Sequence, residues 1–99
     1  MNKNESNIKL NNQRILDLKG FGPKSEDIFA QVNVHSVEDF FETEPFTLYA
    51  NLKRSLKGTG LNSIYAILGA REGVHWQEIK RTRKTEILMR LDEMGLAPK

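Results

Sequence analysis

Large apolar residues recur along this chain at spacings of three and four, and glycine or proline separates the runs. The most regular run has Leu61, Ile64, Tyr65 and Leu68 at positions i, i+3, i+4 and i+7, which is the pattern of one face of an α-helix. No segment alternates apolar and polar residues for long enough to predict a strand. The sequence therefore predicts an all-α fold of five to six short helices.

Capping residues indicate where most of these helices begin or end. Ser36 precedes Asp39 by three residues, as in a capping box, and Pro45 suits the first position of the next helix. Asn33 tolerates the left-handed conformation of a helix exit, and Thr82 is the expected N-cap of the last helix. The expected inward-facing residues of the other helices are Ile15, Leu18, Ile28, Phe29, Val32, Val37, Phe40, Phe41, Phe46, Tyr49, Leu52, Leu56, Ile87, Leu88, Leu91 and Met94.

The length and composition indicate one domain. The chain has 99 residues and no cysteine, which excludes disulfides, thiolate zinc sites and cysteine nucleophiles. Residues 1–12 hold five Asn and are expected to form a flexible leader, followed by a helical domain over 13–95 and a tail over 96–99. The longest apolar run, residues 64–68, is too short to cross a membrane. We therefore expect a soluble, cytoplasmic protein with no membrane partner.

The segment Leu18–Ser25 contains two glycines one residue apart, followed by Pro-Lys-Ser, a layout that indicates a helix-hairpin-helix motif. Glycine lets the backbone approach another chain closely, and the N–H groups at the start of the next helix attract an anion. We expect Gly20, Gly22, Lys24 and Ser25 to contact a nucleic-acid backbone. The alternative is an ordinary glycine turn that stops a helix and binds nothing.

A second glycine turn follows 38 residues later. Residues 56–63 repeat the Leu, Lys, both Gly and Ser of the first turn at the same spacings, so the chain holds one or two hairpin motifs. A duplication and a chance match both explain the repeat. If two hairpins pack as a pair, Arg54, Lys57 and Gly60 become candidate nucleic-acid contacts.

Charge is distributed unevenly along the chain. Residues 1–50 hold five Lys or Arg against eight Asp or Glu, a balance of −3, whereas residues 51–99 hold ten against five, a balance of +5. Such a division favours an acidic partner. The densest basic cluster is Lys80, Arg81, Arg83 and Lys84. These four are further candidate nucleic-acid contacts, with ordinary solvated surface as the alternative.

Residue patterns that carry catalytic or metal chemistry are missing from the sequence. No acid pair, nucleophile–base set or metal-ligand spacing occurs, and His75 has neither a cysteine nor a second nearby histidine as partner. The adjacent Trp76 is expected to be a buried core residue. We therefore expect no catalytic residues, no metal site and no cofactor.

The sequence resembles the C-terminal domain of the TfoX (Sxy) family, bacterial regulators linked to natural competence. The resemblance runs from Ile15 to Leu91. It implies a helical, hairpin-containing fold that binds nucleic acid or a partner and catalyses no reaction. Its carriers are Gly22-Pro23-Lys24-Ser25, Val34-His35-Ser36, Asp39-Phe40, Tyr49, Leu52-Lys53, Leu61-Asn62, Tyr65-Ala66, Gly69-Ala70, Gly73, His75-Trp76, Lys84 and Ile87-Leu88.

The chain departs from the family pattern at three points. Asn33 stands where the family usually has glycine, and Glu44-Pro45 replaces a typical Gly-Ala. Family members typically carry another domain ahead of this one, so a stand-alone version of the C-terminal domain is expected.

The sequence leaves two hypotheses for the function. The first is a module that grips the DNA backbone without reading sequence, in competence or transcriptional regulation; the second is a protein–protein docking module in a regulatory complex.

Overall fold

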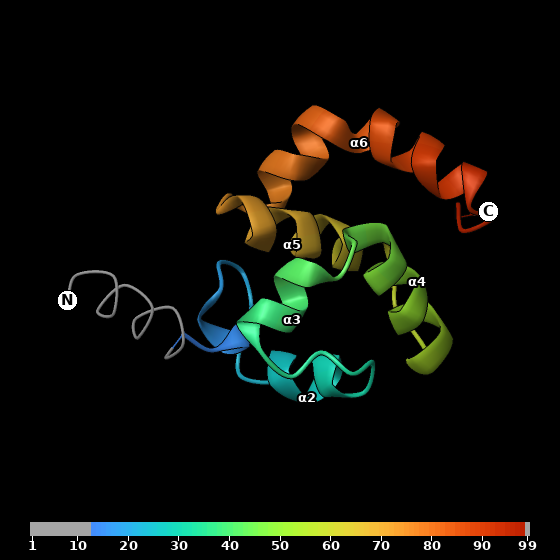
Figure 1. The fold of residues 1–99 in the computed structure, drawn as a ribbon. Helices are drawn as coiled ribbons and strands as arrows, with labels where there is room; N and C mark the ends of the chain where they lie inside the picture. The colour runs from blue at the N-terminus through green and yellow to red at the C-terminus, as the bar shows by residue number, and fades with distance from the viewer. Residues whose placement is uncertain (1–12, 99) are drawn as a thin grey trace.

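The computed structural model describes residues 13–98, and within them the prediction of an all-α fold is confirmed (Figure 1). The expected leader over 1–12 lies outside the described residues. The elements are one 3₁₀ turn and five α-helices: η1 (Ile15–Asp17), α2 (Ser25–Ala30), α3 (Val37–Glu42), α4 (Pro45–Ser55), α5 (Leu61–Glu72) and α6 (Trp76–Glu93).

Local capping chemistry places several helix ends where the sequence predicts them. The Ser36 hydroxyl accepts a hydrogen bond from the Asp39 N–H at 3.0 Å, and the Asp39 carboxylate accepts one from the His35 N–H at 3.0 Å. Pro45 occupies the first turn of α4. Asn33, with φ 64°, is in the left-handed region as expected after α2.

The first and last helices differ from the prediction. The segment around Ile15 forms only a 3₁₀ turn, because Gly20 reverses the chain with φ 84° before a costly helical nucleus can be extended. The last helix begins at Trp76 rather than at Thr82, with the His75 Nδ1 accepting the Gln77 N–H at 3.1 Å. Thr82 lies inside this helix, where its hydroxyl donates back to the Glu78 carbonyl at 2.8 Å.

Helix α5 is central to the packing. It contacts α4 and α6 along its length, whereas α2 packs on η1, and Figure 1 shows α6 lying across α5. The most deeply buried large side chains are Tyr49, Tyr65, Phe40, Ile15, Leu48, Ile64, Ile67, Ile79, Ile87 and Leu91. Over the described residues, no helix combines the length and the apolar character that crossing a membrane requires.

Eight residues that were expected in the core are not fully buried. Ile28, Phe41 and Met94 are exposed. The half-buried ones are Val32, Leu56, Leu61, Trp76 and Leu88. The short helix α2 buries Ser25 and Phe29 instead of Ile28. Phe41 is covered on one side by the Arg71 guanidinium, 5.6 Å from its ring centre, while Met94 lies beyond the last buried turn of α6.

Arg71 joins two helices through the backbone. Its Nη1 donates to the carbonyl oxygens of Phe40, Phe41 and Thr43 at 3.3, 3.1 and 3.2 Å. These carbonyls lie at the C-terminal end of α3, where helix geometry leaves them without partners. Sequence patterns gave no signal for this role because the partners lie about thirty residues away in the chain.

Glu44 caps α4 and links it to α6. Its carboxylate accepts from the Thr47 N–H at 2.8 Å, and a second oxygen lies 3.8 Å from Arg90. Burial disfavours the charged carboxylate, but the N–H groups of Thr47 and Phe46, with Arg90, hold the Glu44 pKa below its ordinary value.

This cap predicts a pH-dependent stability. Glu44→Ala should lower the free energy of unfolding by about 0.5–2 kcal/mol at neutral pH, the usual cost of losing an N-cap. Since the pKa of Glu44 is lower in the folded state, its contribution is present above the unfolded value of about 4.3 and disappears as the pH falls through the folded value. Urea titrations of wild type and variant from neutral to acidic pH should therefore converge. Glu42→Ala is the control, and a constant difference at every pH would contradict the assignment.

Candidate nucleic-acid interface

The first glycine turn is formed by backbone hydrogen bonds on both sides of Phe21. The Phe21 N–H donates to the Leu18 carbonyl at 3.0 Å, and the N–H and hydroxyl of Ser25 both donate to the Gly22 carbonyl, at 3.0 and 2.7 Å. Gly20 has φ 84°, a conformation that favours glycine, while Gly22 is outside that region. The element ahead of the turn is the 3₁₀ turn η1 rather than a helix, and only the first of the two glycines is in a conformation that favours glycine.

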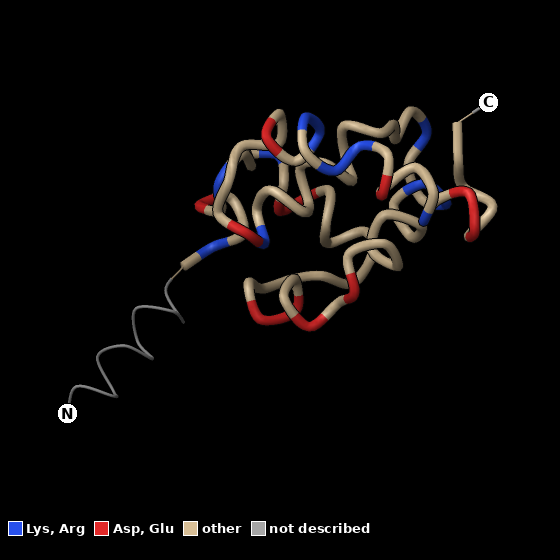
Figure 2. The backbone as a smooth tube through the Cα atoms, turned by 90° about the horizontal axis from the view of Figure 1, so that it is seen from above, with Lys and Arg blue, Asp and Glu red and all other residues tan. Residues whose placement is uncertain are grey.

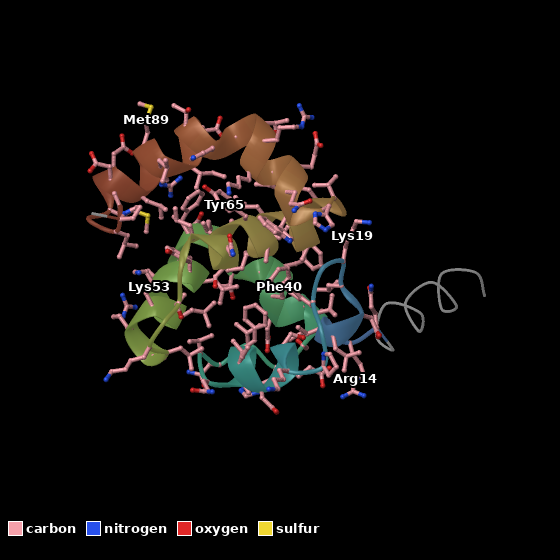
Figure 3. All side chains as sticks on the ribbon, turned by 180° about the vertical axis from the view of Figure 1, so that it is seen from behind. Arg14, Lys19, Phe40, Lys53, Tyr65 and Met89 are labelled. Carbon is pink, nitrogen blue, oxygen red and sulfur yellow. The ribbon has the colours of Figure 1, made fainter. Side chains whose placement is uncertain are left out.

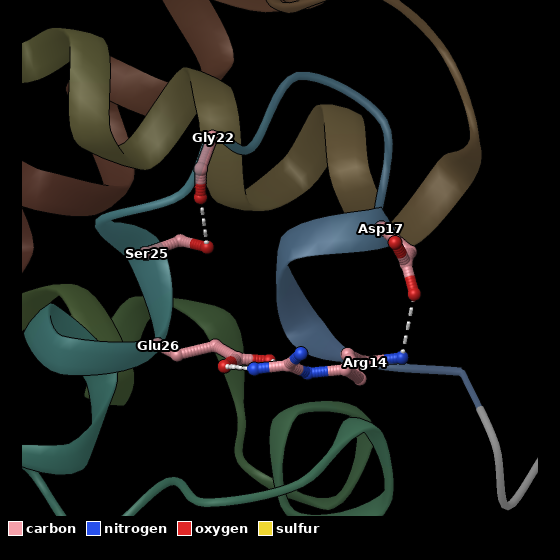
Figure 4. Close-up of polar contacts among 5 residues, drawn as sticks. All are labelled: Arg14, Asp17, Gly22, Ser25 and Glu26. Atoms are coloured by element: carbon pink, nitrogen blue, oxygen red, sulfur yellow. Dashed lines mark hydrogen bonds and ion pairs between the residues drawn. The ribbon is translucent and has the colours of Figure 1, made fainter.

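Acidic residues lie where this turn would have to receive a phosphate. Glu26 and Asp27 occupy the first turn of α2. Glu26 accepts from the Nε of Arg14 at 2.9 Å, as Figure 4 shows. Carboxylates at a helix N-terminus already satisfy its dipole and repel a second anion. Lys19 and Lys24 are both exposed in the turn, so the first turn offers two cations, with two carboxylates directly after the second of them.

The second glycine turn has the same backbone geometry as the first. Gly58 has φ 84°, equal to that of Gly20, and the Ser63 N–H donates to the Gly60 carbonyl at 2.9 Å, as the Ser25 N–H does to Gly22. Gly60 is the N-cap of α5 and lies in extended backbone at φ −118°. The predicted similarity between the two segments therefore extends to their turn conformations.

The charges around the second turn differ from those around the first. Helix α5 has no acidic residue in its first turn and no side-chain cap, so no side chain of its own first turn competes with an anion for its N-terminus, although the Ser63 N–H is already bonded to the Gly60 carbonyl. The Lys53 ammonium donates to the Thr59 carbonyl at 3.3 Å and lies 5.7 Å from the centre of the Tyr49 ring. Arg54 donates to Asn51, and Lys57 is exposed.

The stretch of sequence without acidic residues extends well beyond the second turn itself. Between Glu44 and Glu72 the sequence has no Asp or Glu, while it has Lys53, Arg54 and Lys57 around the turn. By contrast, residues 25–52 have no Lys or Arg and six carboxylates, and the colouring of Figure 2 follows this division along the backbone. The labelled Lys19 and Lys53 lie on opposite sides of the domain in Figure 3.

The basic cluster on α6 is largely balanced by acids. Arg81 pairs with Glu78 at 2.5 Å, and Arg83 pairs with both Glu72 and Glu86. Burial opposes the charged form of Arg83, but these two carboxylates raise its pKa above the ordinary value. Within the described part of the chain, Lys80 and Lys84 have no ion pair.

The candidate residues do not form one surface. One groove is lined by the first turn and by Ser63 of α5; the residues of the turn are Gly20, Gly22, Lys24 and Ser25. No residue of the α6 cluster lines this groove. Arg54 is in the last turn of α4, where it lines a separate hollow with Asn33 and Asn51, and Lys57 follows three residues before Gly60. Lys53, which forms a basic cluster with Arg54 and Lys57 in the sequence, completes this second group.

These observations define a small helical domain with two glycine turns of matching conformation, of which the second has the more favourable surroundings for an anion. The chain belongs to the TfoX C-terminal domain family, whose model matches residues 11–91. The resemblance drawn from the sequence is thereby confirmed. No curated protein and no solved structure matches the sequence.

Proposed function

We propose that this domain binds the phosphate backbone of nucleic acid without reading its sequence, and that the contact is centred on the second glycine turn. The observation that carries the proposal is the uncapped twelve-residue helix α5, which has no acidic residue in its first turn and is preceded by no Asp or Glu back to Glu44. Lys53 lines a hollow together with Gly60 and Leu61 at its N-terminus, and Arg54 and Lys57 are close to Lys53 in the sequence. No catalytic step is part of this function.

The physical argument rests on complementary charge. The first N–H groups and the positive end of the α5 dipole point out of the helix at Gly60, and a phosphate oxygen accepts hydrogen bonds from such groups. Three neighbouring cations release counterions from the nucleic acid on binding, which supplies sequence-independent affinity. Contacts of this kind position a protein on a duplex but do not specify bases. The regulatory role implied by the TfoX family is compatible with such a module.

Charge reversal at the second turn tests the assignment. Lys57→Glu should weaken binding to any duplex by about tenfold or more at low salt, because it removes one phosphate contact and adds a repelling charge. Lys84→Glu changes the net charge equally but lies on α6, and we expect it to bind nearly as wild type does. Fluorescence anisotropy with a labelled duplex measures both.

The wild-type dissociation constant is expected on the order of 10⁻⁴–10⁻⁶ M at physiological salt. Two duplexes of unrelated sequence should give similar values. A loss in Lys84→Glu that equals or exceeds the loss in Lys57→Glu would move the interface to α6 and contradict the proposal.

A further inference from the structure

An apolar groove of about 490 Å³ lies between the first glycine turn with α2 on one side and α5 on the other. It exists because α2 packs on η1 while α5 packs on α4 and α6, and no extensive backbone contact joins α2 to α5. Lys24 is the one charged residue among those around the groove. The lining residues are Gly20, Phe21, Gly22, Pro23, Lys24, Ser25, Ile28, Phe29, Leu52, Ser63, Ala66 and Ile67.

Ile28 leaves apolar surface uncovered at the edge of this groove. It is 37% exposed, whereas Phe29 beside it is 4% exposed. Behind it, the rings of Phe21 and Phe29 pack 5.2 Å apart, and Leu52 and Ile67 line the opposite part of the groove. A continuous apolar surface of this kind, bordered by a cation, is typical of a place where another molecule binds.

We propose that this groove binds an amphipathic helix of a partner protein, and that an acidic residue of that helix pairs with Lys24. A groove between two helices accepts a third helix through apolar residues at i, i+3 or i+4, and i+7. Among the described residues there is no sheet edge to which an extended peptide could add. Lys24 is the one charged residue that lines the groove, and the pair with Arg14 offsets the charge of Glu26 beside it, so charge complementarity favours a partner helix with one acidic residue within reach of Lys24.

The groove is suited to side chains of a protein rather than to an enclosed small molecule. It is open to solvent along one side, whereas small-molecule sites cover most of the ligand surface. A helix would cover Ile28 with its apolar face and leave its polar face in water. This site is separate from the second glycine turn, so the proposal goes beyond nucleic-acid binding and does not depend on it.

Selection from a display library of helical peptides with one randomised face tests this site. Enriched peptides should carry apolar residues at helical spacing together with Asp or Glu. They should bind Ile28→Gln about tenfold more weakly, since the loss of a buried apolar side chain changes affinity on that scale. Met89→Gln also replaces an apolar side chain by glutamine, at a residue of α6 that is 64% exposed. This control variant should bind the peptides as wild type does.

Charge provides the second readout. Lys24→Glu should lower the affinity for an acidic peptide by about two- to fivefold or more, the scale of an exposed charge pair. The same variant should bind more tightly to a version of the peptide in which Lys replaces the acidic residue. Failure to enrich any peptide, equal binding by Ile28→Gln and wild type, or enrichment of basic peptides would each overturn the proposal. A wild-type dimer that becomes monomeric in Ile28→Gln would also overturn it, because a second copy would then occupy the groove. Duplex binding by Ile28→Gln should be unchanged.

Discussion

Phe40→Ala should lower the free energy of unfolding by about 3–5 kcal/mol, the usual cost of deleting a fully buried phenylalanine. Phe40 is 0% exposed. Its ring packs against those of Phe21, Phe29 and Phe41, with centres 5.5, 5.7 and 5.4 Å away. The side chain therefore connects the first glycine turn, α2 and α3. A loss of this size is a large share of the stability of a small domain.

Urea denaturation followed by circular dichroism measures this loss. Phe41→Ala is the matched control, because Phe41 is 42% exposed and Figure 3 shows its neighbour Phe40 directed into the core. We expect the control to cost much less. Equal losses in the two variants would mean that the aromatic cluster is not organised around Phe40.

Gly69→Ala is expected to destabilise the protein although it improves helix propensity. Gly69 lies inside α5, and a β-carbon there would stand 2.6 Å from the Val74 carbonyl oxygen and 3.3 Å from the Trp76 nitrogen. Alanine gains about 1 kcal/mol of propensity over glycine in a helix. The clash is with backbone rather than with a flexible side chain, so α5 and the start of α6 must separate. We expect a net loss on the order of 1–3 kcal/mol.

Gly22→Ala is the control for this substitution. The space around Gly22 is open and its φ is not in the left-handed region, so the change should stay within about 0.5 kcal/mol. Thermal and urea unfolding of the two variants give the comparison. A Gly69→Ala protein as stable as wild type would contradict the close approach of α6 to α5.

Features determined by neighbouring residues were predictable from the sequence. Ser36, Pro45 and Asn33 act within one turn of their own positions, because capping and left-handed exits depend on local hydrogen bonds and backbone freedom. The conformation of the glycine turns follows from the same local chemistry. This is why the helical fold and the boundaries between Asn33 and Gly73 were largely predictable.

Features determined by distant contacts were not predictable. The start of α6 was misplaced because Thr82 has the composition of a cap, while the turn of chain before Trp76 depends on its approach to Gly69. The pairing of Glu26 with Arg14, twelve residues earlier in the chain, has no signal in the local sequence pattern. The exposure of Ile28 likewise depends on how α2 packs against η1, which no local pattern encodes.

The most direct test of nucleic-acid binding at the second glycine turn is the slope of log affinity against log salt concentration for three proteins. Wild type should give about −2.7, which is 0.9 for each of three phosphate contacts. Arg54→Gln/Lys57→Gln should reduce the slope to about −0.9, while Lys24→Gln should leave it unchanged. The absence of salt-dependent binding to any duplex would contradict nucleic-acid binding. A slope that flattens in Lys24→Gln but not in the double variant would place the contact at the first turn instead.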